Sequence, residues 1–288
     1  MDLTDIKTIK ALLARHGFHF SKSMGQNFLI ADWVPRDIAE AAGLDEGCGV
    51  LEIGPGIGPL TVQLAQRAGR VAAIELDRAL LPVLAETMAP YPNVEVVPGD
   101  VLKLDLTAIA AEKFQGLTPI VCANLPYNVT SPILDKLVES PCFTAFTVMI
   151  QREVARRLCA PQGSSEGGSF SLFLQYYMKP ELLFDVPPEK FLPAPKVTSA
   201  VIRCVRRERP AVDVADESFF FKVMRGGFLL RRKTLANSLS AALPGIPKES
   251  IQQAIADMGL PAAVRGEQLT LEDFAALSAA LGREADGD

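Results

Sequence analysis

The stretch that decides the fold is Glu52-Ile53-Gly54-Pro55-Gly56-Ile57-Gly58-Pro59. It follows the apolar segment 50–53, which we interpret as a buried strand, and it opens a helical pattern over 59–68. Glycines let the backbone turn sharply and approach a ligand closely. A dinucleotide-binding fingerprint would place its third glycine where Pro59 stands, and proline suits the first turn of a helix. The stretch therefore predicts a strand, a ligand-binding turn and a helix.

Strands and helices alternate along most of the chain. Further strands are predicted at 70–75, 94–98, 120–123, 146–150, 181–186 and 198–205. Helical periodicity covers 4–16, 32–42, 59–68, 78–88, 102–113 and 131–139. Such alternation indicates βαβ units and a mostly parallel sheet covered on both faces. We expect an α/β fold with seven strands.

The pattern becomes wholly helical after Arg209-Pro210. Helices are predicted at 216–230, 232–242, 248–258 and 271–281. We place a domain boundary near residue 207. The chain is thus predicted to form an α/β domain over 1–207 and a small all-α domain over 208–288.

Three acids stand in order at the ends of the first three strands of the α/β pattern. Glu52 precedes the glycines, where it would repel a pyrophosphate and suits a cationic ligand end. Glu75 lies 21 residues after Gly54, the distance at which an acid binds ribose hydroxyls. Asp100 can accept a hydrogen bond from an adenine amine. An adenosine with a cationic amino-acid tail describes S-adenosylmethionine, so we expect a Rossmann-like class I methyltransferase domain.

Another strand end carries Asn124-Leu125-Pro126-Tyr127, directly after the apolar run 119–123. A side-chain amide can accept a hydrogen bond from an exocyclic amine, and a tyrosine ring can stack on a base. On its own, such a turn is more often a simple strand end. Next to a predicted methyl-donor site, it indicates chemistry on the amino group of a flipped nucleobase.

Composition argues against several other kinds of site. The two histidines, His16 and His19, lie near the start of the chain and offer no catalytic triad or histidine-rich metal site. No apolar run approaches 18 residues, and no secretory or organellar signal is recognisable. The cysteines lack metal-site spacing and indicate reduced thiols in a cytoplasmic protein: Cys48, Cys122, Cys142, Cys159 and Cys204. We therefore expect no metal and no membrane partner.

Charge is distributed unevenly along the chain. The net charge of −5 by itself argues against a nucleic-acid partner. Residues 203–233, however, hold nine Lys and Arg against four acids. This basic segment is either a solvated face or a phosphate-binding face. For RNA binding it offers Arg225, Arg231, Arg232 and Lys233.

With these motifs in order, the chain resembles the ribosomal RNA adenine N6,N6-dimethyltransferase family, and within it the bacterial small-subunit branch. The resemblance covers essentially the whole length. Besides the stretches above, it is carried by Lys22-Ser23-Met24-Gly25-Gln26-Asn27-Phe28-Leu29, by 151–158, by Phe191-Leu192-Pro193-Ala194-Pro195-Lys196-Val197 and by 231–235.

The resemblance implies a cofactor site for S-adenosylmethionine and an adjoining base site. Within the cofactor site, Asn27 and Leu29 would close over the ligand, Glu75 would face its ribose and Asp100 its adenine. Its full membership is Gln26, Asn27, Leu29, Glu52, Gly54, Gly56, Glu75, Leu76, Asp100, Val101 and Asn124. The base site would comprise the target-holding residues Asn124, Leu125, Pro126 and Tyr127, with Phe191 stacking on the opposite side of the base.

The implied substrate is a pair of adjacent adenosines in the 3′-terminal hairpin of small-subunit rRNA, within an immature ribosomal subunit. We expect the enzyme to act as a monomer.

One alternative is a large-subunit rRNA adenine methyltransferase of the macrolide-resistance type; the continuation over 128–132 and the low pI favour the small-subunit reading. A second alternative is an assembly factor that acts mainly by binding. A nicotinamide dehydrogenase is disfavoured by Pro59 and by the lack of a hydride-site histidine.

Overall fold

The computed structural model describes residues 1–18 and 26–285. His19 and the first part of the predicted motif 22–29 lie outside the described residues. The chain forms two compact units. The first comprises Met1–Ala155 and Glu181–Arg206, and the second comprises Arg156–Pro180 and Arg207–Asp288.

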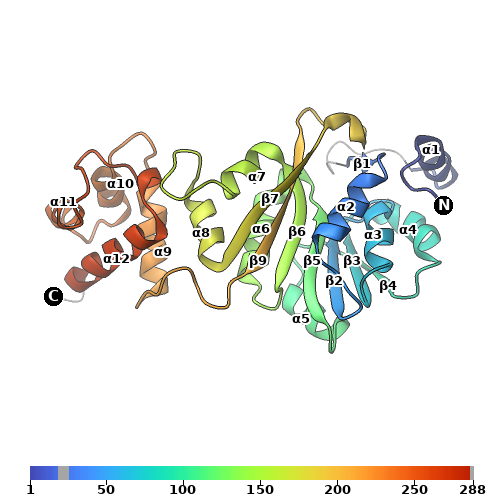
Figure 1. The fold of residues 1–288 in the computed structure, drawn as a ribbon, viewed down its shortest axis with the longest axis horizontal. Coiled ribbons are helices and arrows are strands. Elements are labelled where there is room, and N and C mark those ends of the chain that lie inside the picture. Colours follow the sequence, from blue (N-terminus) through green and yellow to red (C-terminus); the bar gives the residue numbers. More distant parts are fainter. Residues whose placement is uncertain (19–25, 286–288) are drawn as a thin grey trace. The chain divides into compact units, whose positions relative to one another are not determined.

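The first unit is built around a seven-stranded sheet with the order β4-β3-β2-β5-β6-β9-β7 (Figure 1). Neighbouring strands from β4 to β6 run parallel, and β9 pairs antiparallel with β6. The strands are β2 (Cys48–Ile53), β3 (Arg70–Glu75), β4 (Val94–Pro98), β5 (Thr118–Asn124), β6 (Ala145–Gln151), β7 (Met178–Val186) and β9 (Ser199–Arg206). The predicted mostly parallel, seven-stranded fold is confirmed.

Alternate residues of the strands face opposite layers of helices, because side chains point to the two sides of a sheet in turn. Val50 and Ile120 belong to a buried cluster with residues of α2 (Trp33–Ala41) and α3 (Pro59–Ala65). On the other face, Gly49 lies against Phe114, which follows α5 (Leu106–Lys113). A Cβ at Gly49 would stand 2.4 Å from the Phe114 ring, so this glycine allows α5 to pack closely on β2.

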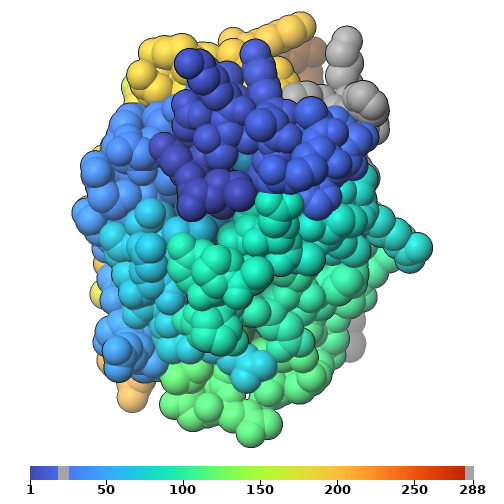
Figure 2. Space-filling view, turned by 90° about the vertical axis from the view of Figure 1, so that its right-hand side faces the viewer, coloured from blue at the N-terminus to red at the C-terminus, as the bar shows by residue number. Residues whose placement is uncertain are grey.

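The N-terminal helix α1 (Ile6–Arg15) packs against α4 (Leu81–Met88). Ile9 and Leu12 share a buried cluster with Val83 and Leu84. Figure 2 shows this side of the unit, with the dark blue atoms near the N-terminus next to the blue-green ones of α4. His16 Nε2 lies 2.7 Å from Glu86 Oε2, so this histidine has a structural partner at the end of α1.

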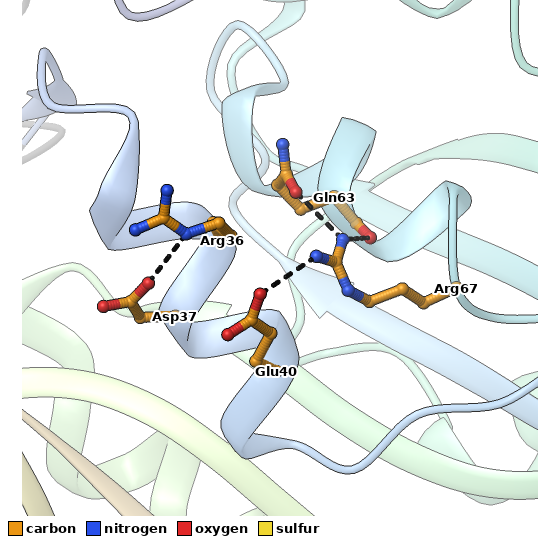
Figure 3. Close-up of polar contacts among 5 residues, drawn as sticks. All are labelled: Arg36, Asp37, Glu40, Gln63 and Arg67. Atoms are coloured by element: carbon orange, nitrogen blue, oxygen red, sulfur yellow. Dashed lines mark hydrogen bonds and ion pairs between the residues drawn. The ribbon is translucent and has the colours of Figure 1, made fainter.

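Polar contacts join α2 to α3 at the surface (Figure 3). Arg67 donates from Nη1 to both oxygens of Gln63 at 2.9 Å, and its Nη2 lies 3.6 Å from Glu40 Oε1 of α2. Arg36 Nε donates to Asp37 at 3.0 Å. Exposed ion pairs stabilise a fold by only about 0–1 kcal/mol. The buried cluster therefore contributes most to the position of α3, the helix that follows the glycine turn.

The remaining elements of the first unit are short, apart from α6 (Thr130–Glu139). A two-stranded sheet pairs β1 (Phe28–Leu29) with β8 (Phe191–Leu192). Single turns of 3-10 helix lie at Arg78–Leu80, Tyr127–Val129 and Pro188–Lys190. Helix α7 (Arg152–Leu158) begins in this unit and continues into the second one.

The second unit is helical. Its helices are α8 (Ser169–Tyr177), α9 (Glu217–Gly227), α10 (Leu235–Ala242), α11 (Lys248–Asp257) and α12 (Leu271–Ala285), with a 3-10 turn at Gly266–Gln268. Aromatic rings of α8 pack on α9: the centroids of Tyr176 and Phe220 lie 5.3 Å apart, as do those of Phe173 and Phe221.

These ring contacts explain why the observed units differ from the predicted ranges 1–207 and 208–288. The segment Arg156–Pro180 belongs to the helical unit, although its last residues already begin β7 of the sheet. Local periodicity cannot reveal a unit made from two separate segments. The catalytic and RNA-binding roles of the two predicted domains stay predictions.

Candidate active site

A cavity of about 220 Å³ lies at the carboxyl edge of the parallel strands in the first unit. Residues that end or follow β2, β3, β4 and β5 line it, together with residues 26–29. The strand order reverses between β2 and β5, and ligands bind at such switch points of open α/β sheets. The cavity brings together every residue of the predicted cofactor site: Gln26, Asn27, Leu29, Glu52, Gly54, Gly56, Glu75, Leu76, Asp100, Val101 and Asn124.

The glycine turn after β2 forms one wall of this cavity. Gly54, Gly56 and Gly58 have φ angles of +69°, +63° and +97°, in the left-handed region that favours glycine. The Gly54 N–H donates to the carbonyl of Ile74 at 2.9 Å, which joins the turn to β3. A Cβ at Gly54 would meet no atom within 4 Å, so open space adjoins this backbone. The turn can therefore admit a ligand close to its main chain.

Glu75 is fixed by the backbone around it. Its Oε1 accepts from the Asp77 N–H at 2.7 Å, and its Oε2 accepts from the Gly56 N–H at 3.3 Å. Burial raises the pKa of this carboxyl above its ordinary value. Gln26 Nε2 donates to Asp77 Oδ2 at 2.7 Å, which ties the N-terminal segment to the end of β3. The role of Asp77 as an anchor was not predicted, although it stands two residues after Glu75.

The part of the cavity beside the loop after β4 contains one acid and two exposed leucines. Asp100 Oδ1 accepts from the Leu102 N–H at 3.0 Å, which sets the loop after β4. Leu76 and Leu102 both line the cavity and are 53% and 37% exposed. Covering such apolar area with a ring stabilises a complex. This part of the cavity therefore fits a flat heterocycle that carries a donor for the carboxylate.

Asn124 and Tyr127 are held in place by partners distant in sequence. Asn124 Nδ2 donates to the Asn27 carbonyl at 3.5 Å, which leaves Oδ1 of the amide to accept from another group. The Tyr127 hydroxyl lies 2.5 Å from Ser199 Oγ at the start of β9. The Leu125 N–H donates to the carbonyl of Met149 at 3.0 Å. Asn124, Leu125, Pro126 and Tyr127 all line the cavity. Ser199 was missed by the sequence analysis.

Phe191 does not join this group. It is not among the residues that line the cavity, and it is almost fully buried in β8. It lies across from Leu29 in the β1–β8 pair and belongs to the same buried cluster as Val34. The neighbouring Leu29 lines the cavity instead. Stacking of Phe191 on a bound base stays a prediction.

Glu52 is the most unusual group of the site. It lines the cavity, yet it is only 1% exposed, and its Oε2 has no hydrogen-bond partner among the described residues. Burial raises the pKa of the Glu52 carboxyl to about 8; the nearby Thr61 hydroxyl acts against this rise, and the charge of Glu75 adds to it. In register beside it, Cys122, Thr147 and Arg203 follow on β5, β6 and β9. A buried carboxylate without a partner is costly, so this wall fits a ligand that brings a positive charge.

We expect the buried Glu52 to make the ligand-free protein less stable as the pH rises. Between about pH 5 and 8 the folded protein keeps a proton that the unfolded chain has lost. The free energy of unfolding contributed by Glu52 therefore falls through this window, by up to about 1.4 kcal/mol per pH unit. Urea unfolding of Glu52→Gln and of the unchanged protein measures the effect. The advantage of the variant should grow from pH 5 to pH 8; a constant difference would contradict the pKa shift.

Comparison with known proteins identifies the family. The family model for ribosomal RNA adenine dimethylase matches residues 17–279. The chain belongs to the ribosomal RNA adenine dimethylase family. The sequence-based predictions of the family, the fold class and a methyltransferase activity are confirmed.

Individual relatives match the chain over nearly its whole length. It is 47% identical to the ribosomal RNA small subunit methyltransferase A proteins of Bacillus mycoides (strain KBAB4) and Bacillus cereus (strain AH187), over 97% of each chain. The crystal structure of the 23S rRNA methyltransferase ErmE is similar to this one with a TM-score of 0.67. The two chains share 28% sequence identity, and the match covers 89% of this chain and 100% of that one. A dimethyladenosine transferase from Plasmodium falciparum, 24% identical over 89% of this chain and 98% of its own, has the same fold with a TM-score of 0.75.

The cations predicted to bind RNA all lie in the helical unit. Arg225 is an exposed residue of α9, and the exposed Arg231, Arg232 and Lys233 lie between α9 and α10. Other members of the basic segment have structural partners. Arg207 Nε donates to the carbonyls of Gln175 and Met178. The phosphate-binding surface that this segment offers is therefore smaller than its composition suggests.

Arg206 is the clearest structural arginine of the basic segment. Its guanidinium donates to the carbonyls of Val138 and Ser140 at 2.9 and 3.1 Å, at the end of α6, and to that of Phe143 at 2.9 Å. Hydrogen bonds from a charged group each contribute about 1.5–3 kcal/mol. Arg206→Met should therefore lower the free energy of unfolding by roughly 2–4 kcal/mol, whereas the exposed Arg209→Met serves as a matched control and should change it little. Chemical denaturation measures both, and equal stabilities would refute the capping role.

The described part of the chain also bears on metal and membrane partners. Within it, no three His, Cys, Asp or Glu side chains gather closely enough to hold a metal ion. No helix in residues 1–18 or 26–285 is both long and apolar enough to span a bilayer.

Proposed function

We propose that the chain transfers methyl groups from S-adenosylmethionine to N6 of two adjacent adenosines in the 3′-terminal hairpin of small-subunit rRNA. The observation that carries this function is the convergence of Asn124, Tyr127 and the three strand-end acids on one cavity. The 47% identity to small-subunit methyltransferases over 97% of the chain supports this target over the large-subunit alternative.

The residues of the cavity fit the donor from end to end. Glu52 would face its ammonium group, because this buried carboxylate has an oxygen that needs a partner. The Gly54 and Gly56 backbone would lie along the methionine part. Glu75 would bind the ribose, and Asp100 would accept from the adenine amine. When bound, the donor supplies a methyl group that is already activated by the sulfonium, so the protein needs no covalent intermediate.

The protein's task at the base is to orient a poor nucleophile. The lone pair of the adenine N6 is delocalised into the ring. Asn124 Oδ1 and the Leu125 carbonyl would accept its two N–H bonds and favour a pyramidal nitrogen. Positive charge that develops on nitrogen would be stabilised by the face of Tyr127, by about 0.5–2 kcal/mol. The cationic product nitrogen is acidic, so no strong general base is required.

Placement of the two reactants should account for most of the rate enhancement. Holding reactants in a productive geometry lowers a barrier by up to roughly 7–11 kcal/mol. The bond from Asn124 to the Asn27 carbonyl and the contact of Tyr127 with Ser199 fix these side chains before the base arrives. The site is therefore preorganised for a base that has left its stack.

The proposed reaction is tested by following the methyl group. Undermethylated small subunits are incubated with the protein and a labelled donor, and the rRNA is digested and mapped. We expect labelled N6,N6-dimethyladenosine at two adjacent positions of the 3′-terminal hairpin. Immature large subunits serve as the control. Label in large-subunit rRNA alone, or no label in either, would refute the proposal.

The exposed cations of the helical unit should hold the RNA backbone. Phosphate contacts position an RNA without reading its sequence. Arg231→Ala combined with Arg232→Ala should weaken subunit binding and flatten the plot of log affinity against log salt by about 0.7–0.9 per lost contact. Donor affinity should not change. Binding titrations between about 50 and 200 mM salt, the range over which phosphate contacts lose most of their affinity, measure the slope. An unaltered slope would exclude this face.

The context of the reaction belongs to the proposal as well. We propose a monomeric enzyme in the cytoplasm that acts on an immature subunit. A binding role in subunit assembly can coexist with catalysis. Comparing subunit maturation in a deletion strain and in an Asn124→Ala strain separates the two: a defect confined to the deletion would assign it to binding.

A further inference from the structure

The helical unit contains a hollow that the proposed reaction does not use. Its volume is about 630 Å³, and it lies along α9 and the turn that follows it. Phe221, Leu229 and Ala242 give it apolar walls, while Lys222 and Arg225 supply two exposed cations. Pockets of roughly 300–1,000 Å³ accommodate small organic groups. The hollow is therefore large enough for one nucleotide.

Arg225 is held in place by aromatic rings. Its guanidinium carbon lies 5.7 Å from the ring centroid of Phe173 and 5.9 Å from that of Phe221. Lys222 stands three residues earlier on the same helix face. Within the described ranges, neither cation forms an ion pair with a carboxylate. The hollow thus offers two cations, one of them preorganised, to an anionic group.

The apolar wall is also fixed, because the end of α9 is tightly packed. A Cβ at Gly226 would come within 2.8 Å of the Ala242 Cβ, so α9 and α10 touch closely here. Ser238 Oγ donates to the Gly226 carbonyl at 2.7 Å and accepts from the Leu230 N–H at 2.9 Å. The turn between them holds Leu229 outward, 57% exposed. A ligand that covers an exposed leucine in a rigid turn removes apolar area from water, and this stabilises the complex.

We propose that this hollow receives one unpaired nucleotide of the rRNA, with its phosphate on Lys222 and Arg225 and its base against Leu229. The inference rests on the proposed function, since it assumes an rRNA substrate. Unpaired bases are the parts of RNA that splay out and pack on protein side chains, mostly aromatic rings and arginine planes. The charge favours RNA over a protein segment, because the exposed cations Arg231, Arg232 and Lys233 follow Leu229 in the same connection between α9 and α10.

Two variants separate the base from the phosphate. Leu229→Ala should weaken binding to undermethylated small subunits by roughly 5- to 30-fold, the range for losing the apolar area that a base covers on one leucine side chain. Its salt slope should stay unchanged, because no charge is removed. Lys222→Gln should lower the slope by about 0.7–0.9. Leu182→Ala, at an exposed leucine of the first unit, is the matched control and should change neither quantity. Normal affinity of Leu229→Ala would overturn the inference.

A cross-linking experiment identifies the occupant itself. A photoreactive amino acid replaces Leu229, the protein is bound to undermethylated small subunits, and the cross-linked product is digested and sequenced. We expect attachment to a single unpaired nucleotide of the rRNA. Attachment to a ribosomal protein or to a base-paired helix, or no attachment, would overturn the inference. Methyl transfer by the unchanged protein is measured on the same subunits, so failure of the proposed reaction is seen separately from failure of the nucleotide site.

Discussion

Asn124→Ala should lower methyl transfer by roughly 100- to 1,000-fold, the loss typical of removing one preorganised polar group from an active site. The variant loses the amide oxygen that would accept an N–H of the adenine amine. It also loses the bond to the Asn27 carbonyl, which steadies the segment over the cavity. Single-turnover methylation of undermethylated small subunits measures the effect on the chemical step.

Two controls separate an effect on the reaction from other effects of the substitution. Asn128→Ala changes an exposed asparagine that does not line the cavity, and its methylation rate should be normal. Calorimetric titration with S-adenosylhomocysteine measures the donor affinity of Asn124→Ala separately, and methylation is then followed at saturating donor, so that a loss of donor binding is not counted as a loss of the chemical step. Turnover of a folded Asn124→Ala protein within a few-fold of normal would remove Asn124 from the reaction.

Glu75→Ala should weaken donor binding by roughly 100-fold or more. A carboxylate that binds ribose hydroxyls contributes about 3 kcal/mol through two charge-assisted bonds. The variant also leaves the Gly56 and Asp77 N–H groups without their acceptor, which loosens the glycine turn. Calorimetric titration with S-adenosylhomocysteine measures the dissociation constant.

The exposed Glu112 provides a matched control for Glu75. It carries the same charge, is not a cavity residue, and Glu112→Ala should bind donor normally. Glu75→Gln keeps an acceptor for the backbone and should fold more stably than Glu75→Ala while still binding donor weakly. Normal affinity in both Glu75 variants would place the ribose elsewhere.

The sequence was sufficient to predict the cavity because its determinants are local. A strand shows its burial as an apolar run, and its end is marked by the first glycine, acid or amide. Since the carboxyl ends of parallel strands share one edge, Glu52, Glu75, Asp100 and Asn124 had to meet once the strands were correctly placed. The glycines at 54 and 56 also predicted the turn locally, because their positive φ angles are ones that favour glycine.

The residues that sequence reasoning missed depend on contacts between distant segments. Ser199 reaches Tyr127 through the start of β9, and Asp77 anchors Gln26 across 51 positions of the chain. In the sequence, Arg206 belongs to a basic segment, but in the structure it donates to the carbonyl of Val138 and caps the end of α6. Such pairings follow from strand register and helix packing, which no periodicity records. The assignment of Arg156–Pro180 to the helical unit has the same origin.

The position of the bound methyl donor decides the roles of Glu52, Glu75 and Asp100. A crystal structure of the full chain with S-adenosylhomocysteine tests this directly. We expect the adenine beside Asp100 between Leu76 and Leu102, the ribose on Glu75 and the amino group toward Glu52. Ligand bound outside this cavity, or in it with the adenine at Glu52 and the amino group at Asp100, would contradict the account.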